Sequence, residues 1–162
     1  MQLYTVARTV RTMALGVWLG GIVMAFIVAP IVFKHLPKDR ILAGNINAEM
    51  FHTAGKVKLV LGLIALAAEG FILFRKPEGS PQGGIRRFLT AGSLLAALVI
   101  AIFVFAYLEP KMLDVRDKIA DFGPNAAESP ERLQFRQLHG ASMALSLLEA
   151  VLVALAIIAG LL

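Results

Sequence analysis

Four long apolar runs, each nearly free of charged residues, dominate the sequence: Thr12–Phe33, Leu59–Phe74, Phe88–Leu108 and Gly140–Leu162. A helix that rises 1.5 Å per residue needs about 20 residues to cross a hydrocarbon core of about 30 Å. The second run is short, but it can begin earlier because Lys56 and Lys58 can extend their ammonium groups to the interface. The sequence therefore predicts four transmembrane helices, over about 12–34, 52–75, 87–108 and 139–162.

Composition agrees with a membrane protein. Hydrophobic residues make up 58% of the chain and charged residues 17%, against roughly 45–50% and about 25% in soluble domains. Arg8 and Arg11 precede the first run like the basic end of a signal peptide, but a signal peptide's apolar region has only about 7–15 residues. We therefore expect the first run to be an anchor, and the fold to be all-α: one four-helix transmembrane bundle over residues 1–162.

The remaining composition excludes several classes of function. The chain has no cysteine, which excludes disulfides and thiolate chemistry. Its net charge is +5, but the basic residues flank apolar runs, where they meet lipid headgroups rather than nucleic acid. Hydrolase, zinc-protease, phosphate-loop and dinucleotide-binding motifs are absent from the sequence. We expect a non-enzymatic protein and assign no cofactor.

The connections between the runs define two sides of the membrane. Face A holds both termini and the loop 75–87, and face B holds segments 35–50 and 109–138. In the second face-B segment, Met112, Val115, Ile119 and Phe122 share one helical side, which predicts a short amphipathic surface helix near 110–122. Ser129 followed by Pro130 predicts the start of the fourth helix.

Basic residues also suggest an orientation. Face A carries six in short segments, and face B carries ten over a stretch more than twice as long. The six are Arg8, Arg11, Arg75, Lys76, Arg86 and Arg87. Dense positive charge near helix ends favours the cytoplasm, so we expect cytoplasmic termini in a plasma membrane, the inner membrane of a bacterium.

Two glutamates lie inside apolar runs, Glu69 in the second and Glu149 in the fourth. A charge at the centre of a membrane helix costs about 2.5–3.5 kcal/mol, so both should face the bundle interior, within a turn or two of each other in depth. Glu149 ends a polar stripe along one helical side, formed by His139, Ser142, Ser146 and Glu149. The stripe is either a proton or cation path from face B, or a set of neutral groups that hydrogen-bond within the bundle.

Other polar and small residues leave alternatives open. The three histidines, His35, His52 and His139, all belong to face B, but their spacing matches no ligand motif and we assign no metal site. In the first helix, Gly16-x-x-x-Gly20 and Gly21-x-x-x-Ala25-x-x-x-Ala29 let another helix approach closely. We interpret both rows as packing within the bundle, with homodimerisation as the alternative. Trp18 lies inside the run and should pack against a neighbour, and Pro30 should kink the helix.

Three stretches carry recognisable motifs: LGVWLGGIVMAFIVAPIVFKHLP at 15–37, YLEPKM at 107–112 and FRQLHGASMALSLL at 135–148. In these the chain resembles the transmembrane protein 205-like family, which is of unknown function. The motif positions that match are Trp18, Pro30, Glu109, Pro110, His139 and Ser142. The chain departs from the family at Ser146, where an asparagine is common. The resemblance implies a four-helix membrane protein, and eukaryotic relatives are associated with platinum-drug resistance and secretory traffic.

These observations lead to three hypotheses. The first is a transporter-like or solute- or cation-binding protein, in which Glu69, Glu149 and His139 converge on a cavity. The second is an accessory or structural subunit of a larger membrane complex, or a homo-oligomer. The third is a metal or haem protein. We also expect the third helix to end just before Pro110, which would bring Glu109 to His139 at the face-B rim.

Overall fold

The computed structural model of the chain describes residues 2–75, 84–119 and 129–161, which are almost entirely helical. The α-helices are α1 (Gln2–His35), α2 (Arg40–Phe74), α3 (Gly84–Phe103), α4 (Glu109–Asp117) and α5 (Pro130–Leu161). A π-helical segment, η1 (Val104–Leu108), joins α3 to α4. Four continuous helices of 32–35 residues are long and apolar enough to cross a membrane. The predicted all-α four-helix bundle is confirmed.

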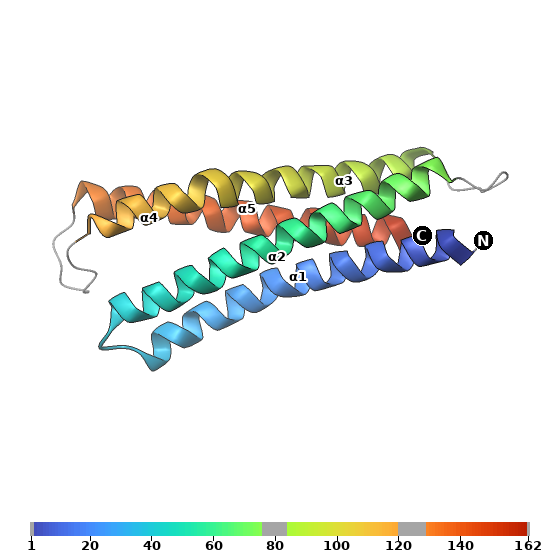
Figure 1. Cartoon of the computed structure of the whole chain (residues 1–162). Helices are drawn as coiled ribbons and strands as arrows, with labels where there is room; N and C mark the ends of the chain where they lie inside the picture. Colours follow the sequence, from blue (N-terminus) through green and yellow to red (C-terminus); the bar gives the residue numbers. More distant parts are fainter. Residues whose placement is uncertain (1, 76–83, 120–128, 162) are drawn as a thin grey trace.

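The bundle is built from two helix pairs. α1 packs most extensively on α2, and α3 on α5. Figure 1 shows both termini at one end of the bundle, together with the end of α2 and the start of α3. This end is face A. The α1–α2 connection and the end of α4 lie at the opposite end, which is face B.

Helix α2 is longer than the sequence indicated. Segment 35–50 was expected to be a face-B connection, but α2 already begins at Arg40, so only 36–39 separates it from α1. The Asp39 carboxylate caps the helix by accepting a hydrogen bond from the Leu42 backbone N–H at 2.8 Å. Such a cap satisfies one of the unpaired N–H groups of the first turn. The α1–α2 hairpin therefore extends well beyond an apolar core of about 30 Å.

The third helix does not end before Pro110, and that prediction is wrong. It passes through η1 into α4 as one continuous helix, Gly84–Asp117. In an α-helix the Pro110 ring would clash with the carbonyl four residues earlier. Here the Glu109 backbone N–H bonds to the Val104 carbonyl, five residues back, and this wider turn accommodates the proline.

The predicted surface helix needs the same correction. Its first part, through Asp117, continues the third helix and is not a separate element on the membrane surface. Lys118 and Ile119 close its last turn, and the remainder of that prediction, 120–122, lies outside the described residues. The predicted start of the fourth helix is confirmed, because α5 begins at Pro130 and the Ser129 hydroxyl accepts a hydrogen bond from the Arg132 N–H at 3.3 Å.

The core occupies the centre of the bundle and its face-A half. The largest fully buried side chains are Trp18, Leu15, Leu94, Glu149 and Val153. In α5 no residue before Glu149 is buried, although that stretch is more than half of the helix. Figure 1 shows the corresponding shape, with α1 and α2 diverging from α4 and α5 toward face B. The two helix pairs are therefore tightly packed near face A and spread apart near face B.

A glycine does mark a close approach between helices, but it is not one of the glycines for which the sequence predicted close packing. A Cβ at Gly62 would lie 2.7 Å from Leu98 Cδ1 and 2.9 Å from Trp18 Cζ3. By contrast, a Cβ at Gly16, Gly20 or Gly21 would meet no atom of the described residues within 4 Å. The expected packing of these three α1 glycines inside the bundle is therefore wrong. The side of α1 that packs in the bundle carries larger residues: Ala14, Leu15, Trp18, Ile22 and Ala25.

This difference in packing predicts that the same change, glycine to alanine, has opposite effects on stability at two positions. Gly62→Ala should destabilise the bundle by about 1–3 kcal/mol, because the Trp18 ring has no room to move away from the added methyl. Gly16→Ala should be neutral or stabilising by up to about 1 kcal/mol, since the site is open and alanine favours a helix. Unfolding in detergent, followed by circular dichroism, measures both. Equal effects of the two substitutions would contradict the packing described.

Candidate functional site

A buried polar cluster joins three helices at the centre of the bundle. Glu149 of α5 is fully buried, and its Oε1 accepts a hydrogen bond from Trp18 Nε1 of α1 at 2.6 Å. Lys58 Nζ of α2 lies 3.0 Å from Glu149 Oε1 and 3.1 Å from Oε2. The carboxylate is thus neutralised by one ammonium group and held by one indole N–H. We call Trp18, Lys58 and Glu149 the central cluster.

The central cluster lies near mid-depth in the membrane. Trp18 and Lys58 stand halfway along helices of 34 and 35 residues, and Glu149 lies in the second half of a 32-residue helix. Helices of this length extend about 50 Å, so their ends protrude beyond a core of about 30 Å. A charge pair at the middle of such helices is far from either interface.

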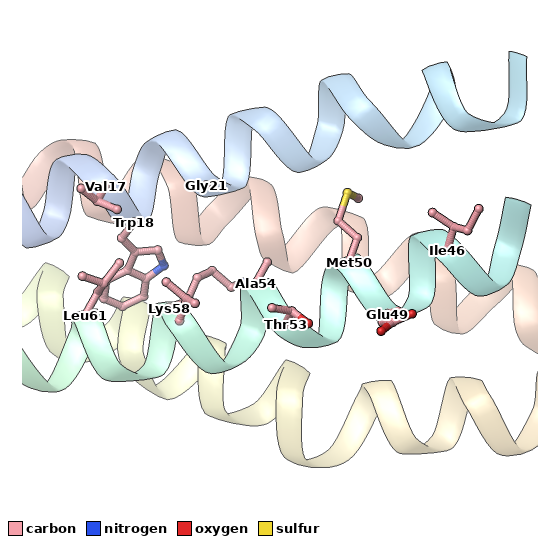
Figure 2. Close-up of a pocket in the computed structure, with 11 residues that line it drawn as sticks. Val17, Trp18, Gly21, Ile46, Glu49, Met50, Thr53, Ala54, Lys58 and Leu61 are labelled. Atoms are coloured by element: carbon pink, nitrogen blue, oxygen red, sulfur yellow. The ribbon is translucent and has the colours of Figure 1, made fainter. Parts of the chain in front are cut away.

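A groove leads from the central cluster toward face B. Its volume is about 560 Å³, and the described residues that line it belong to α1 and α2. Figure 2 shows Trp18 projecting from α1 toward α2 beside Lys58, with Met50 and Ile46 farther along α2. The lining residues are Val17, Trp18, Gly21, Ile46, Glu49, Met50, Thr53, Ala54, Val57, Lys58 and Leu61. Lys58 is therefore shared between the groove and Glu149.

Toward face A the bundle is closed by a second buried ion pair. Arg11 Nη1 of α1 lies 2.5 Å from Glu69 Oε2 of α2, and both side chains are almost fully buried. Arg11 Nη2 also donates to the Gly160 carbonyl of α5 at 2.9 Å, and Arg8 donates to the same carbonyl at 3.1 Å. A Cβ at Gly160 would require the Arg11 guanidinium to move away from the Gly160 carbonyl that it contacts. These contacts tie α1, α2 and α5 together on the face-A side.

Toward face B, long side chains bridge α2 to the third helix. His52 Nδ1 lies 2.9 Å from Glu109 Oε1, and the His52 ring stacks on Phe105 of η1 with centroids 5.2 Å apart. Nearer the face-B end, Arg116 of α4 hydrogen-bonds Asn45 of α2. Polar bridges and the contact of Phe105 with Gly55 thus join α2 to the third helix in this half of the bundle.

The structure confirms the predicted burial of the two intramembrane glutamates but not their convergence. Glu69 is 2% exposed and Glu149 is 0% exposed. Glu149 is level with Lys58, whereas Glu69 lies eleven residues further along α2, about three helical turns. Each carboxylate has its own cation, so the two do not form one site.

The polar stripe of α5 reaches the central cluster only through Glu149. Ser142 and Ser146 are half-buried, and His139 is exposed, with its ring stacked on Phe135 at 6.0 Å. The expected His139–Glu109 contact is wrong, because Glu109 pairs with His52. The continuous third helix is the physical reason: it turns Glu109 toward α2 instead of exposing it at a helix end.

Two functional residues were misinterpreted from the sequence. Lys58 was expected to extend to the interface, and Arg11 was counted among the basic residues of face A, but both neutralise buried glutamates. Lys58 shares the small and polar side of α2 with Gly62, Ala65 and Glu69, and this periodicity was the available signal. Trp18, expected to pack against a neighbour, is fully buried, as predicted.

The histidines do not gather into a metal centre in the part of the chain that the structure describes. No group of three or more histidine, aspartate or glutamate side chains there is placed to hold a metal ion. His35 lies at the end of α1, His52 pairs with Glu109, and His139 stacks on Phe135.

Comparison with known proteins identifies a family and no function. A family described as a domain of unknown function, DUF4149, matches residues 13–121, which is more than half of the chain. The match includes Trp18 and Lys58 but ends before α5, which carries Glu149. No curated protein and no solved structure matches the chain. The chain therefore belongs to the DUF4149 family. It is a four-helix membrane protein with a charged cluster at its centre.

Proposed function

We propose that this protein is a transporter-like, solute-binding membrane protein without enzymatic activity, and that the central cluster is its binding site. One observation carries the proposal. Within the Lys58–Glu149 pair the glutamate side chain is fully buried, while the lysine side chain is 15% exposed and lines the groove. A solute in the groove can therefore reach one charge of a pair whose other charge is sealed inside the bundle.

The position of the cluster supports this function. Substrate sites of secondary transporters lie near the bilayer midplane, where the two sides of the membrane gain access in turn. Here the groove extends toward face B, while the Arg11–Glu69 pair and the buried core close the face-A side. The arrangement matches a state of the protein that is open to one side.

The charge balance favours an organic solute over a free cation. Glu149 is already neutralised by Lys58 and hydrogen-bonded by Trp18, so no unpaired carboxylate remains in the cluster for a metal ion or proton-coupled cation. Isolated intramembrane carboxylates are the usual mark of ion pathways. Within the central cluster, the ammonium of Lys58 is the charged group that lines the groove.

Labelling of single introduced cysteines tests access to the site. Because the chain has no native cysteine, the introduced thiol is the one that reacts. A charged thiol reagent added on face B should label Thr53→Cys, because Thr53 lines the groove. Val60→Cys, exposed on the same helix outside the groove, should react at least about tenfold more slowly, since a lipid-facing thiol rarely ionises. Ala97→Cys is fully buried and should not react.

Labelling of Thr53→Cys only from face A would reverse the proposed direction of access. No labelling from either side would contradict the proposed function, because the groove would then be closed to water-soluble molecules. Right-side-out and inside-out vesicles provide the two additions.

A second function is favoured by a different observation. Gly16 and Gly20 lie on a side of α1 that no other described residue covers. Small residues spaced by four let a partner helix approach closely in a membrane, so we also propose an accessory or structural role in a homo-oligomer or larger complex. Native mass measurement of detergent-extracted protein separates the two: a bound small molecule supports the first function, and a bound protein chain the second.

We also propose a family subgroup and a membrane orientation for this protein. The Trp18, Glu109–Pro110 and His139 motifs support placement in the transmembrane protein 205-like group. Basic residues near both face-A helix ends support cytoplasmic termini in a plasma membrane. Arg11 does not add to this charge, because it pairs with Glu69 inside the bundle. The vesicle labelling above reports the orientation directly.

A further inference from the structure

We propose that the groove binds an amphipathic organic anion: a single carboxylate that pairs with Lys58, attached to an unbranched apolar chain that lies along α2. The inference rests on the proposed solute-binding function and names its ligand class.

Two ionisable residues line the groove, and they specify the sign and number of charges on the ligand. Lys58 lies at the inner end and Glu49 toward face B. An ammonium group has three N–H donors, and the structure places both Glu149 oxygens near Nζ, which leaves donor capacity toward the groove. A ligand carboxylate can use it, whereas a ligand cation finds Glu149 fully buried.

Glu49 limits the ligand to one negative charge. It lies nine residues from Lys58 on α2, about 14 Å along the helix. A second carboxylate at the outer end of the ligand would lie beside Glu49 and be repelled. A monocarboxylate with an apolar chain avoids this repulsion.

The walls of the groove fit a hydrocarbon chain. Between Lys58 and the face-B end the α2 lining includes Val57, Ala54, Met50 and Ile46, and α1 contributes Val17 and Gly21. The stretch from Lys58 to Ile46 is about 18 Å long, which is long enough for an extended medium-chain acyl group. Met50 is flexible enough to adapt to such a chain. The volume of about 560 Å³ lies within the range of small-molecule sites, about 300–1,000 Å³.

Trp18 provides a built-in reporter, because it is the only tryptophan of the chain and it lines the groove. The protein, reconstituted in lipid nanodiscs, is titrated with dodecanoate brominated near its carboxylate, the end that lies at Lys58 beside Trp18, and Trp18 fluorescence is recorded. We expect saturable quenching that unlabelled dodecanoate reverses. The matched brominated dodecanol and dodecyltrimethylammonium should quench only by partition into the lipid, without saturation.

Variants identify the residue that binds the carboxylate. Lys58→Gln alone would leave Glu149 unpaired and could fail to fold, so the informative variant is Lys58→Gln combined with Glu149→Gln, which keeps the acceptor for Trp18. Dodecanoate should bind this double variant at least about tenfold more weakly. Lys58→Arg should retain binding within about tenfold. Each variant keeps Trp18 as reporter.

Three results would overturn the inference: equal saturable quenching by all three probes, tighter binding of the cation, or unchanged dodecanoate affinity in the double variant. Failure of the ligand class is distinguishable from failure of the proposed function. If Thr53→Cys is labelled from face B but dodecanoate neither quenches Trp18 nor slows that labelling, the accessible site stands and the ligand class is wrong. If Thr53→Cys is not labelled at all, the site itself is wrong.

Discussion

Replacing Lys58 with methionine is expected to lower the free energy of unfolding by about 3–5 kcal/mol. The substitution keeps the length and apolar stem of the side chain but removes the only cation beside Glu149 within the described residues. A buried carboxylate that loses its partner pays the full cost of its desolvation. The measurement is unfolding of the detergent-solubilised protein in increasing dodecyl sulfate, followed by circular dichroism.

Two controls separate the ion pair from general effects of the substitution. Lys56→Met, two residues earlier on the exposed side of α2, should change stability by less than about 0.5 kcal/mol. Adding Glu149→Gln to Lys58→Met should recover most of the loss, since the amide oxygen still accepts the Trp18 N–H and no charge remains. Additive losses in the double variant would show that Lys58 and Glu149 are not coupled.

Replacing Arg11 with methionine should have an effect of the same size, about 3–5 kcal/mol, at the other end of the bundle. The guanidinium neutralises Glu69 at 2.5 Å and also donates to the Gly160 carbonyl near the end of α5. Its loss leaves a buried carboxylate without its cation and removes a contact that joins three helices. The same dodecyl sulfate titration measures the loss.

Arg8→Met is the matched control, because Arg8 lies almost one helical turn away on α1 and donates to the same carbonyl. It does not touch Glu69, so we expect a loss of only about 1 kcal/mol. Similar losses for Arg8→Met and Arg11→Met would show that the Gly160 contact, and not the ion pair, stabilises the face-A end. Arg11→Met should also increase face-A labelling of cysteines near the core if the pair closes that side.

The sequence by itself determined the class of fold and the burial of its glutamates. Long apolar runs leave only transmembrane helices as a solution, because a backbone in lipid must satisfy its own hydrogen bonds. The same reasoning applied to Glu69 and Glu149, whose charge cannot face acyl chains. The start of α5 was also local information, since the Ser129 hydroxyl caps the first turn and the ring of Pro130 fixes its backbone in a helical conformation.

Tertiary structure decided which cations pair with Glu69 and Glu149. Arg11 and Lys58 stand near the ends of apolar runs, where long cationic side chains can equally reach lipid headgroups. Helix rotation and depth decide between the two outcomes, and both depend on how all four helices pack. Close approach at Gly62 places Trp18 beside Lys58, and only then does Glu149 of a distant helix meet both.

The course of the third helix also shows the difference between what local sequence and what tertiary contacts determine. Proline at position 110 predicts an interruption, and locally the prediction is sound, because the ring removes one hydrogen bond and blocks another carbonyl. The structure instead widens one turn at Val104–Leu108 and continues to Asp117. Contacts distant in sequence favour this path: Phe105 packs against Gly55 and His52, and Glu109 bonds to His52. Local sequence thus determined which segments are helical and apolar, whereas the charge pairs, the groove and the continuity of the third helix depend on energies that exist only once the helices are packed together.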